Sequence, residues 1–147
     1  MKDTLRQVLA KKGSTVIAVA PGDTVFHALE ELARHNIGAV LVLEGARPVG
    51  MLSERDYARK LALLGRASRQ TLVRDVMSHP VLTVPPEVTV DLALALMTNK
   101  RVRHLPVVEK GSVTGMLSIG DLVNWVISAQ AETIEALQEY IAGRYPG

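Results

Sequence analysis

Gly50-Met51-Leu52-Ser53-Glu54-Arg55-Asp56 and Gly115-Met116-Leu117-Ser118-Ile119-Gly120-Asp121 share five of their seven residues and lie 65 positions apart. At this offset the segment 16–61 aligns with 81–126 without a gap, and 14 of the 46 residue pairs are identical. Chance similarity would not concentrate a block of four identical residues at the same place in both copies. The chain therefore contains one structural unit written twice.

Periodicity and turn residues divide each copy into five predicted elements. In the first copy, strands are predicted over 16–19, 39–43 and 49–52, with helices beginning after Thr24 and near Ser53. Thr24 offers an N-cap to the first of these helices. The run 39–43 is apolar on both faces, which is typical of a strand buried in the middle of a sheet. The order is β-α-β-β-α twice, with a linker at about 62–80.

A unit of about 46 residues is too small to bury enough apolar surface alone. The predicted fold is therefore α+β, with tandem β-α-β-β-α repeats packed sheet against sheet about a pseudo-two-fold axis. The predicted domains are repeat 1 with an N-terminal lead-in over 1–64, the linker and repeat 2 over 65–127, and a C-terminal helical extension over 128–147. This packing creates two symmetry-related clefts between the repeats, where small ligands preferentially bind.

The C-terminal extension is predicted to continue a helix that runs from Asp121 to Ala142. Ile134, Leu137 and Ile141 recur at helical spacing in its second half. Such an apolar stripe needs a partner. Either the stripe packs back on the module, or it packs on a second subunit.

Length and composition restrict the class of protein. At 147 residues and 48% hydrophobic, the chain can form one compact domain. The absence of cysteine excludes disulfides, thiolate nucleophiles and cysteine metal sites. It also permits a reducing compartment, and the expected location is the cytoplasm. The charged N-terminal stretch and the lack of an 18-residue apolar run predict a soluble, untargeted protein without a membrane segment. The 17 basic and 15 acidic residues give a net charge of +2, which disfavours nucleic-acid binding.

Both Ser-x-x-Asp motifs lie where a predicted strand passes into a helix. A serine followed three residues later by an acid is typical of a helix cap. The same geometry suits a ligand, because a helix N-terminus favours phosphate and a carboxylate beside it, Asp56 or Asp121, can accept hydrogen bonds from a ribose diol. On spacing alone, helix capping and nucleotide binding both remain open.

The doubled unit resembles the cystathionine-β-synthase (CBS) domain pair, also called a Bateman module. The resemblance rests on the Gly-h-x-Ser-x-x-Asp motif that closes each copy, and it covers the chain from about Thr4 to Trp125. The stretches Ser53–Lys60 and Val73–Met77 are similar to stand-alone bacterial members. The resemblance implies a regulatory module that binds AMP, ADP or ATP, and in some members NAD or S-adenosylmethionine, between the repeats. It implies no catalytic cofactor.

In that family, each cleft takes its Ser and Asp from one repeat and its adenine-facing strands from the other. Carried over by matching position, the Asp56 cleft would combine Ser53 and Asp56 with Thr83, Val102, Arg103, His104, Leu105 and Pro106. The Asp121 cleft would combine Ser118 and Asp121 with Ala18, Ile37, Gly38, Ala39 and Val40.

The two copies differ in their basic residues. Repeat 2 offers Arg101, Arg103 and His104 where repeat 1 has no basic residue, and Arg55 adjoins the aspartate of the Asp56 cleft. Cationic side chains form strong, charge-assisted hydrogen bonds to phosphate. The Asp56 cleft is therefore the predicted tighter nucleotide site.

No catalytic or metal-binding residues are predicted. The four histidines have no spacing that would place two on one helical turn, and no Walker A, Gly-x-Gly-x-x-Gly or Gly-x-Ser-x-Gly stretch occurs. The alternatives are a small enzyme acting on a nucleotide, which would lack a paired acid and base, and a nucleic-acid-binding regulator.

We expect a homodimer, because CBS pairs often form two-fold discs and symmetric closure is common. Its contact is predicted through 28–34, 93–99 or the C-terminal segment. The sequence does not identify a downstream effector protein.

Overall fold

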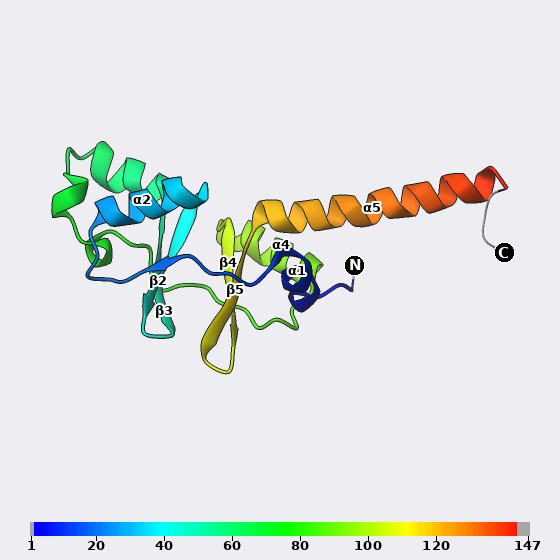
Figure 1. Cartoon of the computed structure of the whole chain (residues 1–147), viewed down its shortest axis with the longest axis horizontal. Coiled ribbons are helices and arrows are strands. Elements are labelled where there is room, and N and C mark those ends of the chain that lie inside the picture. The colour runs from blue at the N-terminus through cyan, green and yellow to red at the C-terminus, as the bar shows by residue number, and fades with distance from the viewer. Residues whose placement is uncertain (1, 144–147) are drawn as a thin grey trace.

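The computed structural model of the chain describes residues 2–143. Two repeats of mixed helices and strands lie side by side, and a long helix extends from the second (Figure 1). Repeat 1 comprises β1 (Ala18–Val19), α2 (Val25–His35), β2 (Ala39–Glu44), β3 (Arg47–Ser53) and α3 (Glu54–Tyr57), which continues as a π-helix over Ala58–Ala62. Repeat 2 comprises α4 (Val90–Lys100), β4 (His104–Glu109), β5 (Ser112–Ser118) and α5 (Ile119–Ile141). The predicted α+β fold with tandem repeats is confirmed.

Two further segments precede the repeats in the sequence. Helix α1 (Leu5–Lys12) comes before repeat 1. The linker before repeat 2 contains the short 3-10 turns Ser68–Gln70 and Val73–Asp75. These two lead-in segments complete the cores described below.

The sheet of repeat 1 has the strand order β1-β2-β3, with β2 in the middle. β2 pairs parallel with β1 and antiparallel with β3. Its residues Val40, Leu41 and Val42 are completely buried. The prediction of a central buried strand is confirmed. Thr24 caps α2 by accepting a hydrogen bond from the His27 N–H over 3.1 Å, which confirms the predicted helix start.

The sheet of repeat 2 has two strands within residues 2–143, rather than the three predicted. β4 pairs antiparallel with β5, but the first predicted strand is reduced to one parallel bridge between Val84 and Val107. In repeat 1, the Leu41 N–H donates to the Ile17 carbonyl oxygen over 3.3 Å. The matching residue in repeat 2 is Pro106, which has no N–H to donate. The loss of this hydrogen bond explains why the prediction of a full strand is wrong.

Each lead-in segment packs on the repeat that it does not directly precede. α1 precedes repeat 1 in the sequence but docks on repeat 2, where the Leu5 N–H donates to the Val88 carbonyl oxygen over 2.9 Å. The linker precedes repeat 2 but docks on repeat 1, where the Val73 N–H donates to the Asp23 carbonyl oxygen over 2.8 Å. The lead-ins are thus exchanged between the repeats.

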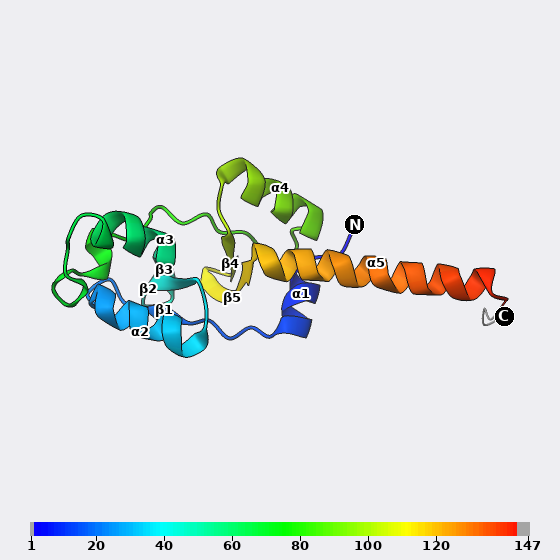
Figure 2. The ribbon, with the colours of Figure 1, turned by 90° about the horizontal axis from the view of Figure 1, so that it is seen from above.

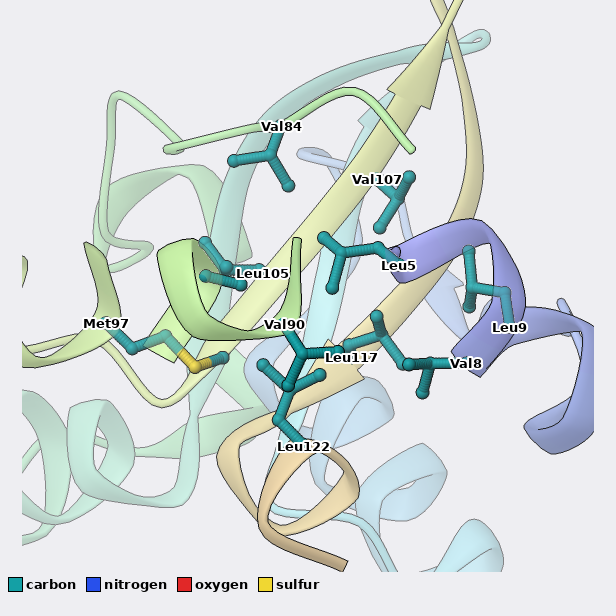
Figure 3. Close-up of a cluster of buried hydrophobic side chains, with 11 residues drawn as sticks. Leu5, Val8, Leu9, Val84, Val90, Met97, Leu105, Val107, Leu117 and Leu122 are labelled. Carbon is teal, nitrogen blue, oxygen red and sulfur yellow. The ribbon is translucent and has the colours of Figure 1, made fainter. Parts of the chain in front are cut away.

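The exchange completes two hydrophobic cores. In repeat 2, Leu5, Val8 and Leu9 of α1 join a buried cluster that contains Leu117 and Leu122 (Figure 3). Two linker residues occupy the equivalent places in the core of repeat 1, Val73 and Val76. Neither core is complete without a segment that lies elsewhere in the sequence.

The glycine that opens each motif is required by this packing. A Cβ at Gly115 would lie 2.6 Å from Leu9 Cδ2, and a Cβ at Gly50 would overlap the side chain of Met77. Both glycines are buried in their strands. They allow the lead-ins to approach the sheets closely, so their role in the motif is structural.

Helix α5 leaves the module after its first turns and projects away from it (Figures 1 and 2). Leu122 near its start is buried in the core of repeat 2. From 130 to 143 every residue is exposed, and the exposed fractions of Ile134, Leu137 and Ile141 are 56%, 57% and 76%. The predicted stripe therefore does not pack back on its own module. Within residues 2–143, no helix combines the length and apolarity needed to cross a membrane.

Candidate functional site

A cavity of about 540 Å³ lies between the two repeats, in front of α3. We call it the Asp56 cavity. Its lining residues come from repeat 1, from the linker and from repeat 2: Gly38, Met51, Ser53, Glu54, Arg55, Asp56, Arg59, Ser78, Pro80, Val81, Leu82, Arg101, Val102, Arg103 and His104. The volume falls in the range of small-molecule sites, roughly 300–1,000 Å³. Because both repeats contribute, the site exists only in the packed pair.

Ser53 and Asp56 form a reciprocal cap at the start of α3. The Asp56 N–H donates to Ser53 Oγ, and the Ser53 N–H and Oγ both donate to Asp56 Oδ2, each over 3.0 Å. Asp56 Oδ1 accepts a hydrogen bond from Ser78 Oγ over 3.0 Å and lies 3.3 Å from Lys60 Nζ. The capping interpretation of the motif is confirmed, and the carboxylate is held with Oδ1 toward an exposed serine.

The N–H groups at the start of α3 already have partners within the protein. The Glu54 N–H donates to the Gly38 carbonyl oxygen, and the Asp56 N–H donates to Ser53 Oγ. The peptide dipoles of α3 and of the π-helix that continues it still point their positive end at the cavity. Direct hydrogen bonds to an anion would therefore come mainly from cationic side chains.

Those cations are four arginines: Arg55, Arg59, Arg101 and Arg103. None of the four forms an ion pair with a carboxylate within residues 2–143. Arg101 ends α4 in the left-handed region at φ 55°, which costs a non-glycine residue about 1 kcal/mol. The four guanidinium groups outnumber the carboxylates of Glu54 and Asp56 in the lining, so the cavity has a positive potential.

His104 lies at the start of β4, in the wall of the cavity. Burial lowers the pKa of its imidazole, and the charges of Lys12 and Arg103 lower it further, against a smaller opposing effect of Asp121. His104 is therefore neutral at pH 7, with one ring nitrogen as a donor and the other as an acceptor. The positive charge at the cavity comes from the arginines alone.

The second motif has a different environment. Asp121 lines a smaller cavity of about 300 Å³ formed by α1 and α5, together with Val8, Lys11, Lys12, Asn124, Trp125 and Ser128. Lys12 Nζ lies 2.6 Å from Asp121 Oδ2 and donates to the Met116 carbonyl oxygen over 2.7 Å. Burial alone would raise the pKa of Asp121, but hydrogen bonds from Lys12 and from the Ser118 N–H outweigh this effect and lower it.

The structure brings together six of the residues predicted for the Asp56 cleft: Ser53, Arg55, Asp56, Val102, Arg103 and His104. Of the others, Thr83 is half-buried outside the lining, and Leu105 and Pro106 are buried in β4. Gly38, predicted for the Asp121 cleft, lines the Asp56 cavity. The remaining residues predicted opposite Asp121 line neither cavity: Ala18, Ile37, Ala39 and Val40. Ser118 caps α5 together with Asp121.

Several lining residues were not predicted for the site. Ser78 and Pro80 come from the linker, whose path between the repeats has no clear signal in the sequence. Lys12, which lines the Asp121 cavity, reaches Asp121 from α1. Lys60 lies outside the lining of the Asp56 cavity and reaches Asp56 from the adjoining helix. The apolar spacing of Leu5, Val8 and Leu9 could have indicated α1, but not the repeat on which it docks.

Comparison with known proteins agrees with this architecture. The family model described as CBS domain matches twice, over residues 6–63 and 73–128. The chain is 36% identical to the mitochondrial CBS domain-containing protein CBSX3 of Arabidopsis thaliana, over 97% of this chain and 73% of that protein. It is 45% identical to the solved CBS domain structure NE2398, with a TM-score of 0.81, covering 85% of this chain and 98% of that one. A candidate signal-transduction protein with CBS domains from Burkholderia ambifaria is 42% identical, with a TM-score of 0.82, over 86% of this chain and 96% of that one. The chain therefore belongs to the CBS domain family and consists of two tandem CBS domains.

Proposed function

We propose that this CBS pair is a regulatory module that binds an adenosine nucleotide in the Asp56 cavity. One observation carries the proposal: the carboxylates of Asp56 and Glu54 and four arginines without acidic partners among residues 2–143 surround a single cavity of about 540 Å³ between the repeats. A carboxylate suits hydroxyl donors, and guanidinium groups suit phosphate oxygens. A ligand that has both kinds of group is a nucleotide.

The ribose would bind at Asp56 Oδ1. Oδ2 already accepts two hydrogen bonds from Ser53, whereas Oδ1 accepts one from the hydroxyl of Ser78, an exposed residue. A ribose hydroxyl can take the place of the Ser78 hydroxyl, which rotates away at little cost because water can solvate it. Ser53 and Lys60 keep the carboxylate oriented during this exchange.

The base would lie against the apolar part of the lining. Met51, Val81, Leu82 and Val102 are half-buried residues of the cavity wall, and they come from both sides of the interface between the repeats. A purine between them would remove apolar surface from water. Because the wall belongs to both repeats and to the linker, a bound ligand would stabilise their relative placement. That effect gives a ligand control over the whole module.

The arginines also favour some members of the family's ligand set over others. AMP, ADP, ATP and NAD are anions, whereas S-adenosylmethionine has a cationic sulfonium group. Four guanidinium groups at the rim attract the first group and repel the second. We therefore propose a phosphate-bearing adenosine ligand for this site, and a binding role rather than a catalytic one.

Calorimetry and thermal shift with adenosine, AMP, ADP, ATP, NAD and S-adenosylmethionine test the proposal. A ligand that binds only the native protein raises its unfolding temperature. Asp56→Asn should weaken nucleotide binding by about 10-fold to 100-fold, because hydrogen bonds to a charged group contribute about 1.5–3 kcal/mol. The matched variant Asp121→Asn, in the equivalent cap of repeat 2, should leave the affinity unchanged. Equal effects of the two variants, or no binding of any of these ligands to the wild type, would contradict the proposal.

A further inference from the structure

The exposed face of α5 has a seven-residue repeat. Ile127, Ile134 and Ile141 are seven residues apart, and Val123 and Leu137 each lie four residues before one of them. All five are exposed, by 42% at Val123 and by 56% to 76% at the others. Alternating steps of three and four residues define the a and d positions of a coiled coil. We call these five residues, with Gln130 at the remaining d position, the α5 seam.

The charges of α5 lie away from the seam. The positions that flank it in its exposed half are uncharged: Ala131, Thr133, Gln138 and Tyr140. The acidic residues occupy the outward positions: Glu132, Glu135 and Glu139. A second copy of the same helix can therefore meet the seam without bringing like charges together. A partner selected by charge would instead need basic or acidic residues at the flanking positions.

The exposed half of α5 has little to stabilise it in a single copy. Residues 130 to 143 are all exposed, and an isolated helix of this length is marginal in water. Its last turn contains no basic residue, and Glu139 lies in that turn, near the negative end of the helix dipole. Packing along the seam would provide the missing stabilisation.

We propose that α5 pairs with α5 of a second copy as a parallel two-stranded coiled coil. The three a positions named above are isoleucine, and leucine occupies one of the three d positions, Leu137. In parallel coiled coils, isoleucine at a with leucine at d favours two strands. Parallel pairing also places Gln130 opposite its own counterpart, where the two amides can bond to each other. The large side chains of two seams expose on the order of 1,000 Å² of surface in total, which is about the minimum for a specific interface. Both views show the C-terminal half of α5 extending away from the module, where a second copy can reach it (Figures 1 and 2).

Light scattering of the full chain at increasing concentration tests the pairing. The wild type should change from a 15.9 kDa particle to one of twice that mass in the micromolar range. Ile134→Glu should weaken the dimer at least about 100-fold, because it places two unpaired carboxylates in the seam. The matched control is Leu92→Glu on α4, another exposed leucine, which should leave the dimer intact. Thermal unfolding of both variants verifies that the module remains folded.

Cysteine cross-linking tests the direction of the helices. The chain has no native cysteine, so Leu137→Cys introduces one defined thiol. In a parallel pair the two thiols face each other, and mild oxidation should give a disulfide-linked dimer that Ile134→Glu abolishes. A wild type that stays at 15.9 kDa at several hundred micromolar would show that the seam does not bind a second copy. A dimer broken by Leu92→Glu but not by Ile134→Glu would also overturn the proposal, as would a confirmed dimer in which the Leu137→Cys protein does not cross-link.

Discussion

Replacing Arg103 by alanine tests directly whether the Asp56 cavity holds phosphate. Arg103 is exposed, lies just before β4 and has no ion-pair partner within residues 2–143, so the variant should fold normally. A charge-assisted hydrogen bond contributes about 1.5–3 kcal/mol, and the exposure of Arg103 places its contribution near the lower value. The affinity for ATP or ADP should therefore fall about tenfold. Adenosine has no phosphate, so its affinity should change by less than about twofold.

Calorimetric titration of adenosine, AMP and ATP into the wild type and Arg103→Ala proteins measures this difference. The loss for ATP should shrink at higher salt, because exposed charges are screened over about 8–10 Å at physiological ionic strength. Arg66→Ala is the control, since Arg66 is an exposed linker arginine outside the cavity lining. If Arg103→Ala reduced the affinities for adenosine and ATP by the same factor, or if Arg66→Ala had the same effect, Arg103 would not be a phosphate ligand.

Three other substitutions test the backbone conformation of Arg101 and the effects of pH at Asp121 and His104. Arg101→Asn should raise the free energy of unfolding, measured by urea titration, by about 0.5–1 kcal/mol, because asparagine tolerates the left-handed backbone better than arginine. The same variant should bind ATP more weakly in calorimetry, because it removes one guanidinium group from the Asp56 cavity. The native pKa of Asp121 is below its ordinary value of 3.8, so its carboxylate stabilises the fold above that pH and loses this effect as the pH falls through the native pKa. Lys12→Met should therefore move the midpoint of acid unfolding, followed by circular dichroism, to higher pH. The native state lowers the pKa of His104 below 6.5, so the stability of the wild type should fall as the pH decreases below that value. Thermal unfolding at several pH values should show that this fall is smaller in His104→Gln than in the wild type. The control His79→Gln should show the same fall as the wild type.

Repeats and local patterns made much of the fold predictable. The alignment at an offset of 65 residues places α2, β2, β3 and α3 of repeat 1 on α4, β4, β5 and the start of α5, and β2 forms where its apolar run predicts it. The same register brings Ser53, Asp56, Arg103 and His104 to one cavity, because residues at equivalent ends of paired repeats meet at their interface. The Ser-x-x-Asp cap is a local structure, so its geometry follows directly from the spacing.

The features that could not be predicted depend on contacts between distant segments. Nothing in the first twelve residues indicates that α1 docks on repeat 2 rather than on the adjacent repeat 1, so the pairing of Lys12 with Asp121 could not be foreseen. Asp56 is paired instead with Lys60 from its own helix, at the position where repeat 2 has Trp125. The missing strand of repeat 2 reflects the hydrogen bond that Pro106 cannot donate, within a segment that otherwise has the pattern of a strand.

The exchanged lead-ins have a consequence for the covalent chain. The loop around Gly65 and Arg66 is exposed and joins the two halves of the molecule. A protease cut between these residues would leave one fragment that holds α1 and repeat 1, and another that holds the linker valines and repeat 2. Each fragment would still insert its N-terminal segment into the core of the other. Leu5 of the first fragment would pack beside Leu117 in repeat 2, and Val73 of the second fragment would pack in the core of repeat 1. The nicked protein should therefore migrate as one particle, and two separately expressed halves should assemble into a functional whole, as two subunits of a domain-swapped dimer do.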